Sequence, residues 1–302
     1  NSSKISIGHF REAFHGRSGY TLSVTNTDPN KTKRFSKHKW PRFSNPIIKY
    51  PHTIEEDNRL LEVEGDVLEE IRTSAAGNSN LAAVLIEPIQ GEGGDNHFTN
   101  RFLKDLQEIC HEIDALFIVD EVQTGMGATG KMWAFEHAGI EPDIVAFGKK
   151  MQVCGMFAGG RLHENEDNVL STSSRINSTW GGNLIDFVRS AEILKIVERD
   201  RLIENTANQG ERLLNGLNEL SNQYSVISSV RGKGTMCAFT LPNATLRDRY
   251  RKLAMDEGVF TLSSGSASIR LRPSLAISSD EVDEALTAFG AAAQKLEREL
   301  VI

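Results

Sequence analysis

Three short apolar runs of this sequence each end at residues whose side chains could take part in chemistry. The runs and the residues that follow them are 82–86 before Glu87, 116–119 before Asp120, and 144–147 before Gly148 and Lys149. Short apolar runs of this kind are typical of strands buried in a parallel sheet. Ligands of such sheets bind beyond the carboxyl ends of the strands. A carboxylate and a lysine are therefore expected to face one another across a small ligand.

Pyridoxal phosphate (PLP) is a ligand that needs such a pair. A carboxylate held against its pyridine nitrogen keeps the ring protonated, and a lysine amine forms a Schiff base with its aldehyde. Asp120 suits the first role and Lys149 the second, although spacing alone does not choose Lys149 over Lys150. The simpler alternative is that Asp120 caps a turn and that both lysines are solvated.

The segments between these runs indicate how the chain would position them. Apolar residues recur at helical spacing over 99–113, and a short helical segment is expected near 131–138. Strands that alternate with helices predict an α/β fold with a mostly parallel sheet. Four prolines between residues 29 and 51 predict a long irregular surface loop.

The last third of the chain predicts a smaller α+β domain. The expected elements are helices over 184–222 with a break near Asp200, strands at 224–230 and 235–241, a helix at 244–257, strands at 258–262 and 268–272, and a helix from Ser279 to about 299. We predict a large domain over residues 1–205 and a small domain over residues 206–302.

Composition excludes several other classes of protein. The net charge is −7 and no run of basic residues stands out, which argues against nucleic acid as a partner. No apolar stretch approaches the ~20 residues of a membrane helix. The three cysteines are far apart and lack metal-ligand spacing, so we expect no metal site and a reducing, cytoplasmic location.

A glycine pattern at 125–131 resembles two nucleotide-binding motifs. Gly125, Gly127 and Gly130 have the dinucleotide spacing, and with Lys131 they spell most of a P-loop. Met132 stands where the P-loop needs Ser or Thr, and five residues separate Gly125 from the preceding strand. We interpret these glycines as shaping a loop along the site.

At these strand ends the sequence resembles the class III (omega-amino acid) aminotransferases. The stretches that carry the resemblance are EPIQGEGG at 87–94, DEVQTG at 120–125 and PDIVAFGK at 142–149. The similarity extends from about Phe14 to about residue 295. Within the class, FHGRSGY at 14–20, GGDNH at 93–97, GKKMQVCG at 148–155 and STWGGN at 178–183 look most like L-lysine 6-aminotransferases. Mitochondrial-type 4-aminobutyrate aminotransferases are the second resemblance.

The resemblance implies a role for each cofactor residue. Lys149 matches the Schiff-base lysine, Asp120 the partner of the pyridinium nitrogen and Gln123 the contact to the ring hydroxyl. Phe14 matches the aromatic that stacks on the cofactor ring. Thr179 matches a phosphate ligand donated by a neighbouring subunit, which implies a homodimer.

The resemblance also implies how carboxylates are held. Arg17 matches the arginine for the carboxylate of the amine donor, and Arg270 the one for the α-carboxylate of 2-oxoglutarate or glutamate. Glu92 matches a switch residue that neutralises Arg270 while lysine is bound. Arg272 is close in sequence, but the order of residues favours Arg270. The implied substrates are L-lysine and 2-oxoglutarate.

One feature of the family is missing. Members carry a Ser-Gly-x-Glu-Ala-like turn, well before the position of Phe14, that cradles the PLP phosphate at a helix N-terminus. No stretch of this sequence matches that turn. We therefore expect a partial sequence that lacks an N-terminal segment. The alternatives are a catalytically incompetent fragment of an aminotransferase and a fold relative that acts as an interaction module.

Overall fold

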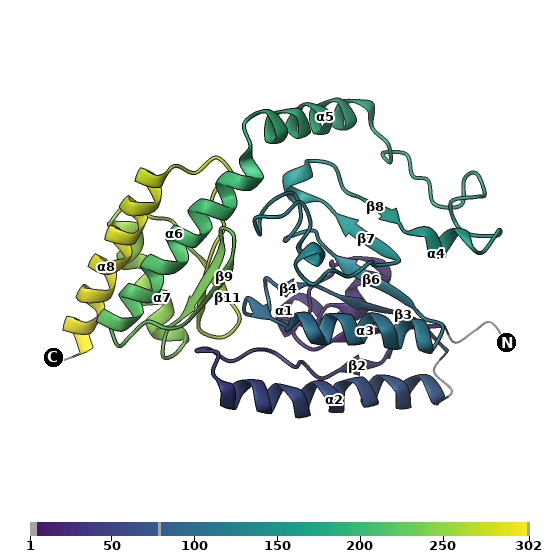
Figure 1. The fold of residues 1–302 in the computed structure, drawn as a ribbon, viewed down its shortest axis with the longest axis horizontal. Helices are drawn as coiled ribbons and strands as arrows, with labels where there is room; N and C mark the ends of the chain where they lie inside the picture. The colour runs from purple at the N-terminus through teal and green to yellow at the C-terminus, as the bar shows by residue number, and fades with distance from the viewer. Residues whose placement is uncertain (1–4, 78–79, 301–302) are drawn as a thin grey trace.

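A six-stranded sheet forms the centre of the computed structural model, which describes residues 5–77 and 80–300 (Figure 1). The strand order is β2-β1-β3-β6-β7-β8. The strands are β1 (Ser6–Phe10), β2 (Arg42–Phe43), β3 (Leu81–Ile86), β6 (Leu116–Asp120), β7 (Ile144–Phe147) and β8 (Gly155–Ala158). Every pairing is parallel except that of β7 with β8. The expected α/β fold with a mostly parallel sheet is confirmed.

The register of this sheet brings its catalytic candidates to one edge. In the parallel pairs Val84 lies opposite Phe117, and Val119 lies opposite Val145. The three expected strands therefore run side by side, and their carboxyl ends meet at the same edge. β1 and β8, to which the sequence pattern assigned no strand, extend the sheet on either side.

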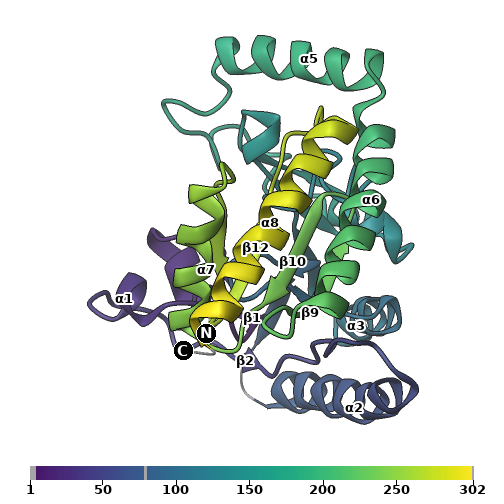
Figure 2. The same cartoon turned by 90° about the vertical axis from the view of Figure 1, so that its left-hand side faces the viewer.

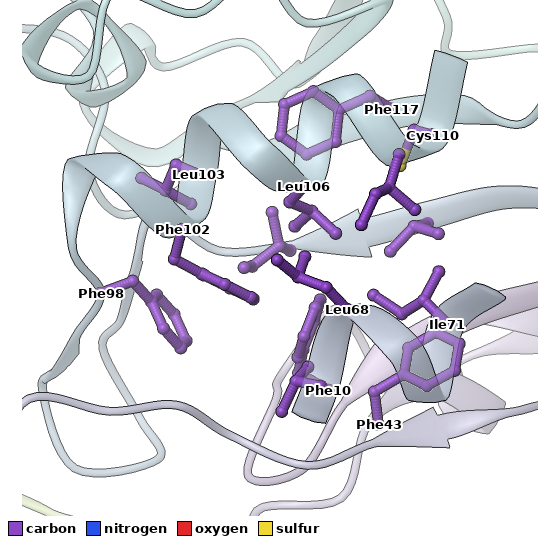
Figure 3. Packing of buried hydrophobic residues seen from close by; sticks show 14 of the residues in the cluster. Phe10, Phe43, Leu68, Ile71, Phe98, Phe102, Leu103, Leu106, Cys110 and Phe117 are labelled. Carbon is purple, nitrogen blue, oxygen red and sulfur yellow. The ribbon is translucent and has the colours of Figure 1, made fainter. Parts of the chain in front are cut away.

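Two helices cover one face of the large sheet and bury its main apolar core (Figure 3). They are α2 (Ile54–Ala76) and α3 (Asn100–Glu112). α3 was expected at 99–113, whereas α2 was not expected at all. Among the largest buried side chains are Phe10, Phe43, Phe102 and Phe117. Aromatic and aliphatic burial of this kind is the main stabilising contribution in such a layer.

The acidic character of α2 hides its apolar face in the sequence. Glu64 lies on the buried side of α2 and forms an ion pair of 2.7 Å with Arg101 of α3. Thr53 caps the helix by accepting from the Glu56 amide at 3.3 Å.

The segment 29–51 is more ordered than the expected surface loop. It contains the short helix α1 (Pro29–Thr32) and the edge strand β2, and Phe43 of β2 is completely buried. The prediction of an irregular loop was wrong there because β2 pairs with β1. The short helical segment near 131–138 is a 3-10 helix, Ala134–His137.

The C-terminal part forms a second, antiparallel sheet of order β11-β12-β10-β9 with helices packed on it (Figure 2). Its strands are β9 (Ser228–Lys233), β10 (Met236–Thr240), β11 (Leu262–Ser264) and β12 (Ser268–Leu271). Its helices are α6 (Leu202–Gln223), α7 (Ala244–Asp256) and α8 (Ser279–Leu300). The helix break occurs where α5 (Leu184–Arg199) ends, because Arg201 adopts a left-handed φ of 52°.

Two of the expected C-terminal strands are displaced. The strand predicted at 224–230 begins only at Ser228, and the one predicted at 258–262 begins at Leu262. In both places the preceding residues continue a turn from the end of a helix. The remaining small elements are η1 (Gly19–Val24), β4 (Ile89–Gln90), β5 (Asn96–His97), η3 (Lys149–Met151) and α4 (Gly160–His163).

Two separate apolar cores lie on the two sheets, one built mainly from residues 10–140 and one from residues 213–296. The division at residues 205 and 206 stays a prediction. Within residues 5–77 and 80–300, no helix is long and apolar enough to cross a membrane. The same residues contain no cluster of three His, Cys, Asp or Glu side chains suited to a metal ion.

Candidate active site

Asp120 ends β6 with its carboxylate buried and fully engaged. Its Oδ1 accepts a hydrogen bond from the Val122 amide at 3.0 Å, and its Oδ2 accepts one from Nδ1 of His15 at 2.8 Å. The other ring nitrogen of His15 is buried without a partner among the described residues. His15 stands inside the motif at 14–20, but no pattern in the sequence indicates a role for it. Its contact with Asp120 makes it a positioning residue for that carboxylate.

Glu87 binds the backbone of Phe14 and of the turn that follows β3. The backbone amide of Phe14 donates to one carboxylate oxygen at 3.0 Å, and the amide of Gly91 donates to the other at 3.3 Å. Burial raises the pKa of Glu87 to about 7, the nearby Asp120 adds to the rise, and His15 opposes it. Glu87 therefore fixes the half-buried Phe14 near the strand ends.

Lys149 follows β7 and opens the 3-10 turn η3 with a left-handed φ of 46°. Its side chain is accessible, yet the surrounding protein removes enough water to lower the pKa of its ammonium group. Arg270 and Arg272 add to this lowering of the pKa, while Asp120 and Glu87 oppose it. A lowered pKa leaves more of the amine unprotonated and nucleophilic at neutral pH.

Electrostatic surroundings distinguish Lys149 from Lys150. The pKa of Lys150 is also lowered by burial, but the charges that act on it are those of Arg272 and Lys149. Asp120 and Glu87 act on Lys149. The structure thus brings the first lysine of the pair to the two carboxylates.

Arg270 reaches this edge from β12 of the second sheet. Its Nη1 donates to the Gly91 carbonyl at 3.3 Å and to Oε1 of Gln123 at 3.4 Å. Its Nε is buried and has no partner among the described residues. Burial is the largest cause of the lowered pKa of Arg270, followed by the charge of Arg272. Arg272 itself is bonded to the buried carboxylate of Asp95, so Arg270 is the better placed of the two for a ligand carboxylate.

Glu92 does not contact Arg270. Its carboxylate forms an ion pair with Lys31 and accepts a hydrogen bond from Oγ1 of Thr27 at 3.3 Å. Glu92, Lys31 and Arg270 all line one cavity of about 950 Å³. The expected pairing of Glu92 with Arg270 is absent from this arrangement, although the cavity joins the two side chains.

The second sheet holds the turn 91–95 that carries Glu92. Arg231 is buried and donates to two carbonyls of this turn, one of them that of Asp95 at 2.8 Å. The Ser264 hydroxyl and the Gly265 amide bond two further carbonyls of the turn at 2.8 and 3.0 Å. The C-terminal part of the chain therefore sets the position of Glu92. Sequence reasoning missed Arg231, for which no local motif offers a signal.

Two residues implied by the resemblance lie away from this cluster. Arg17 is exposed and makes no hydrogen bond or ion pair with the described residues. Thr179 is exposed in the segment that leads into α5. Their assignments stay predictions.

The glycines at 125–131 form a tight loop packed against α6. Gly127 and Gly130 have φ of 84° and 83°, and a Cβ on either would come within 3.0 Å of Ile203 or Ala207 respectively. Close approach to a helix explains these glycines without a nucleotide, which favours the loop interpretation.

Comparison with known proteins agrees with this geometry. Residues 1–293 match the family Aminotransferase class-III. The chain is 45% identical over 291 residues to the L-lysine-epsilon aminotransferase of Streptomyces clavuligerus. This alignment covers 95% of this chain and 64% of that protein. It is 37% identical over 279 residues to the mitochondrial 4-aminobutyrate aminotransferase of Rattus norvegicus, covering 89% of this chain and 54% of that protein.

The fold also matches that of a solved structure. The lysine aminotransferase from M. tuberculosis in the internal aldimine form superimposes with a TM-score of 0.92 at 43% identity, covering 96% of this chain and 67% of that one.

These matches place the chain in a family. The chain belongs to the class III aminotransferases, which depend on PLP. It spans 64% of the length of the first curated relative. The activity, substrates and partners of the whole protein are therefore taken up below as proposals.

The buried carboxyl of Glu87 should make stability depend on pH. Because its pKa is about 7 in the folded chain and 4.5 in the unfolded one, the folded state binds more protons between these values, and stability falls as pH rises through them. We expect the decrease in the free energy of unfolding between pH 5 and pH 8 to be smaller in Glu87→Gln, by on the order of 3 kcal/mol. Urea unfolding at each pH measures this.

The exposed Glu108→Gln serves as the control and should leave the profile unchanged. Parallel profiles for Glu87→Gln and the unsubstituted chain would contradict the shifted pKa of Glu87.

Proposed function

We propose that the whole protein is a PLP-dependent aminotransferase that transfers the ε-amino group of L-lysine to 2-oxoglutarate. The products would be glutamate and 2-aminoadipate 6-semialdehyde. The observation that carries this proposal is that Lys149, Asp120 and Glu87 stand at the carboxyl ends of adjacent parallel strands, close enough for both carboxylates to act on the pKa of the Lys149 amine. The similarity to lysine aminotransferases supports the choice of substrate.

The residues at this edge fit the ring of PLP. Asp120 offers a buried carboxylate fixed by two hydrogen bonds, and Lys149 offers an amine of lowered pKa. Phe14 provides an aromatic face, and the amide of Gln123 lies near Arg270. When bound, PLP draws electrons away from the carbon that bears the substrate nitrogen. Asp120 would hold the proton on the ring nitrogen.

Lys149 would perform the acid–base work. Its lowered pKa makes the free amine available to accept a proton from the substrate carbon next to nitrogen and to return it to the cofactor carbon. Asp120 and Glu87 limit this lowering, so the amine can carry a proton as well as release one. Both directions are needed because the two half-reactions are the reverse of one another.

Carboxylate recognition would fall to the arginines. Arg270 lines the cavity, and its Nη1 makes long hydrogen bonds of 3.3 and 3.4 Å, which suits a forked contact of the guanidinium with the α-carboxylate of 2-oxoglutarate. Arg17 would hold the carboxylate of the amine donor. Its exposed position in this chain requires other parts of the protein to enclose it.

The second candidate function is transamination of 4-aminobutyrate or another omega-amino acid. The identity to the rat 4-aminobutyrate aminotransferase favours it, although this identity is lower than that to lysine aminotransferases. Donors that differ in length and in the position of their carboxylate are distinguished by a few side chains of the pocket.

Activity measurements on the full-length protein should separate these functions. With 2-oxoglutarate as acceptor, we expect a higher kcat/KM for lysine than for 4-aminobutyrate or ornithine. Lys149→Ala should lower kcat by about 10³-fold or more, because both the covalent anchor and the acid–base are lost. Lys150→Ala is the matched control and should retain activity. A better rate with 4-aminobutyrate would move the assignment to the neighbouring enzyme, and activity in Lys149→Ala would reject the role of Lys149.

We also propose that the protein is a homodimer in which Thr179 contacts the cofactor phosphate of the neighbouring subunit. Large apolar side chains are exposed along the segment around Thr179 and the start of α5. They are Trp180, Leu184, Ile185, Phe187 and Val188. α5 lies at one end of the molecule in both views (Figures 1 and 2). Contiguous apolar exposure of this kind is typical of a protein interface.

Sedimentation velocity tests the dimer. We expect the full-length protein to sediment as a dimer and Ile185→Asp to shift it toward the monomer, because a carboxylate cannot be buried unpaired in an apolar interface. Lys195→Asp places the same group at an exposed position farther along α5 and should leave the dimer intact. A monomer without any substitution, or an unchanged dimer in Ile185→Asp, would contradict this interface.

A cytoplasmic location is the last part of the proposal. Cys110 and Cys237 are buried free thiols and Cys154 is an exposed one, a set that suits a reducing compartment. Fractionation of the source cells tests this, and recovery of the protein outside the cytoplasm would contradict it.

A further inference from the structure

Lys31 occupies a position that neither the sequence motifs nor the proposed chemistry explains. It lies in α1, at the rim of the 950 Å³ cavity that also contains Glu92 and Arg270. Its ammonium forms the ion pair with Glu92 and lies 5.4 Å from the ring centroid of Phe14. One side chain therefore touches both the carboxylate and the aromatic ring of the site.

The contact pairs Glu92 with Lys31 and leaves Arg270, which lines the same cavity, without a carboxylate partner among the described residues. Glu92 is held by Lys31 and by Thr27, while Arg270 is left with the Gly91 carbonyl and the Gln123 amide as its hydrogen-bond acceptors. The buried Nε of Arg270 has no partner among the described residues. An arginine without a carboxylate is ready to bind one supplied by a ligand.

We propose that Lys31 is a positioning residue that holds Glu92 away from Arg270 and thereby opens Arg270 to the α-carboxylate of a 2-oxo dicarboxylic acid. The inference rests on the proposed function, because it assigns Arg270 to that carboxylate. Lys31 acts through Glu92 and does not itself contact the acid.

The exposure of the pair suits an exchangeable contact. The side chain of Lys31 is 31% exposed and that of Glu92 is 20% exposed, so water screens their attraction. Partly exposed ion pairs are weak enough to break when another cation competes. Glu92 can therefore exchange its partner, and the pair with Lys31 is the arrangement that leaves Arg270 without a carboxylate from the described part of the chain.

The backbone around Glu92 permits such a movement of the side chain alone. Carbonyls of the turn 91–95 are fixed by Arg231, Ser264 and Gly265, so the Cα of Glu92 stays in place. The choice between Lys31 and Arg270 then becomes a choice between side-chain rotamers. Both Lys31 and Arg270 line the cavity that Glu92 also lines.

Lys33 provides a matched control. It lies two residues from Lys31, is exposed, and donates to Oδ1 of Asn30 at 2.8 Å. Removing its charge changes the electrostatic potential of the segment in the same sense as removing that of Lys31. It does not touch Glu92.

The test measures binding of glutarate, an unreactive dicarboxylate, to the full-length PLP-loaded protein by calorimetry, with steady-state KM values measured in parallel. We expect Lys31→Met to weaken glutarate about five- to tenfold and to raise the KM for 2-oxoglutarate similarly, a usual size for coupling between two contacts. The KM for lysine should change less than twofold. Lys33→Met should match the unsubstituted protein, and Lys31→Arg should restore binding because it keeps the cation.

The Glu92→Gln background decides how Lys31 acts. Without the Glu92 charge Arg270 is free in every molecule, so Lys31→Met should cause no further loss of glutarate affinity there. An equal loss in both backgrounds would overturn the proposal, since Lys31 would then attract the ligand directly or support the fold. No loss in the unsubstituted background would overturn it as well.

Failure of the proposed function would look different. A full-length protein that transaminates no omega-amine, but whose glutarate binding still depends on Lys31 through Glu92, would refute the activity and leave this inference standing.

Discussion

The structure depends on burying two carboxylates next to an amine at one edge of a parallel sheet. Glu87 and Asp120 follow neighbouring strands, and Lys149 follows the third, so the register of β3, β6 and β7 alone fixes their separation. Buried charge is costly unless it is hydrogen-bonded. Asp120 meets this cost through His15 and the Val122 amide, whereas Glu87 has its pKa raised to about 7. The two carboxylates differ in environment, and burial gives Glu87 a carboxyl group that titrates near neutrality.

The second sheet completes the site from the far end of the chain. Arg231, Ser264 and Gly265 hold the turn 91–95, and Arg270 extends toward the strand ends of the first sheet. The geometry of the candidate site therefore depends on contacts between residues more than a hundred positions apart in sequence. A shift of the second sheet against the first would move Arg270. It would also move the turn 91–95, because Ser264 and Gly265 hold that turn. In the proposed function, the first sheet supplies the acid–base residues and the second sheet supplies the arginine for the substrate carboxylate.

Local sequence patterns predicted the strands whose residues are apolar throughout. They missed elements whose burial depends on contacts with distant segments. The runs at 82–86, 116–119 and 144–147 are apolar throughout, so their strands and their parallel arrangement could be predicted. α2 was missed because Glu64 occupies its buried side, where Arg101 and the Thr99 hydroxyl bind its carboxylate. The same patterns predicted that Glu87, Asp120 and Lys149 stand at the carboxyl ends of these strands. The partners of Glu92 and the role of His15 did not, because Lys31, Thr27 and Asp120 approach them from distant segments. Choosing Lys149 over Lys150 needed the family resemblance, and the structure adds a physical reason, the carboxylates beside it.

Borohydride reduction after incubation of the full-length protein with PLP, followed by peptide mass mapping, tests the central claim most directly. We expect a single pyridoxyl adduct on Lys149, because the pKa of its amine is lowered and the charge of Asp120 acts on it. Lys150 has a lowered pKa without those carboxylates and should remain unmodified. An adduct on Lys150, on scattered surface lysines or on none would contradict the assignment of this strand edge as the cofactor site.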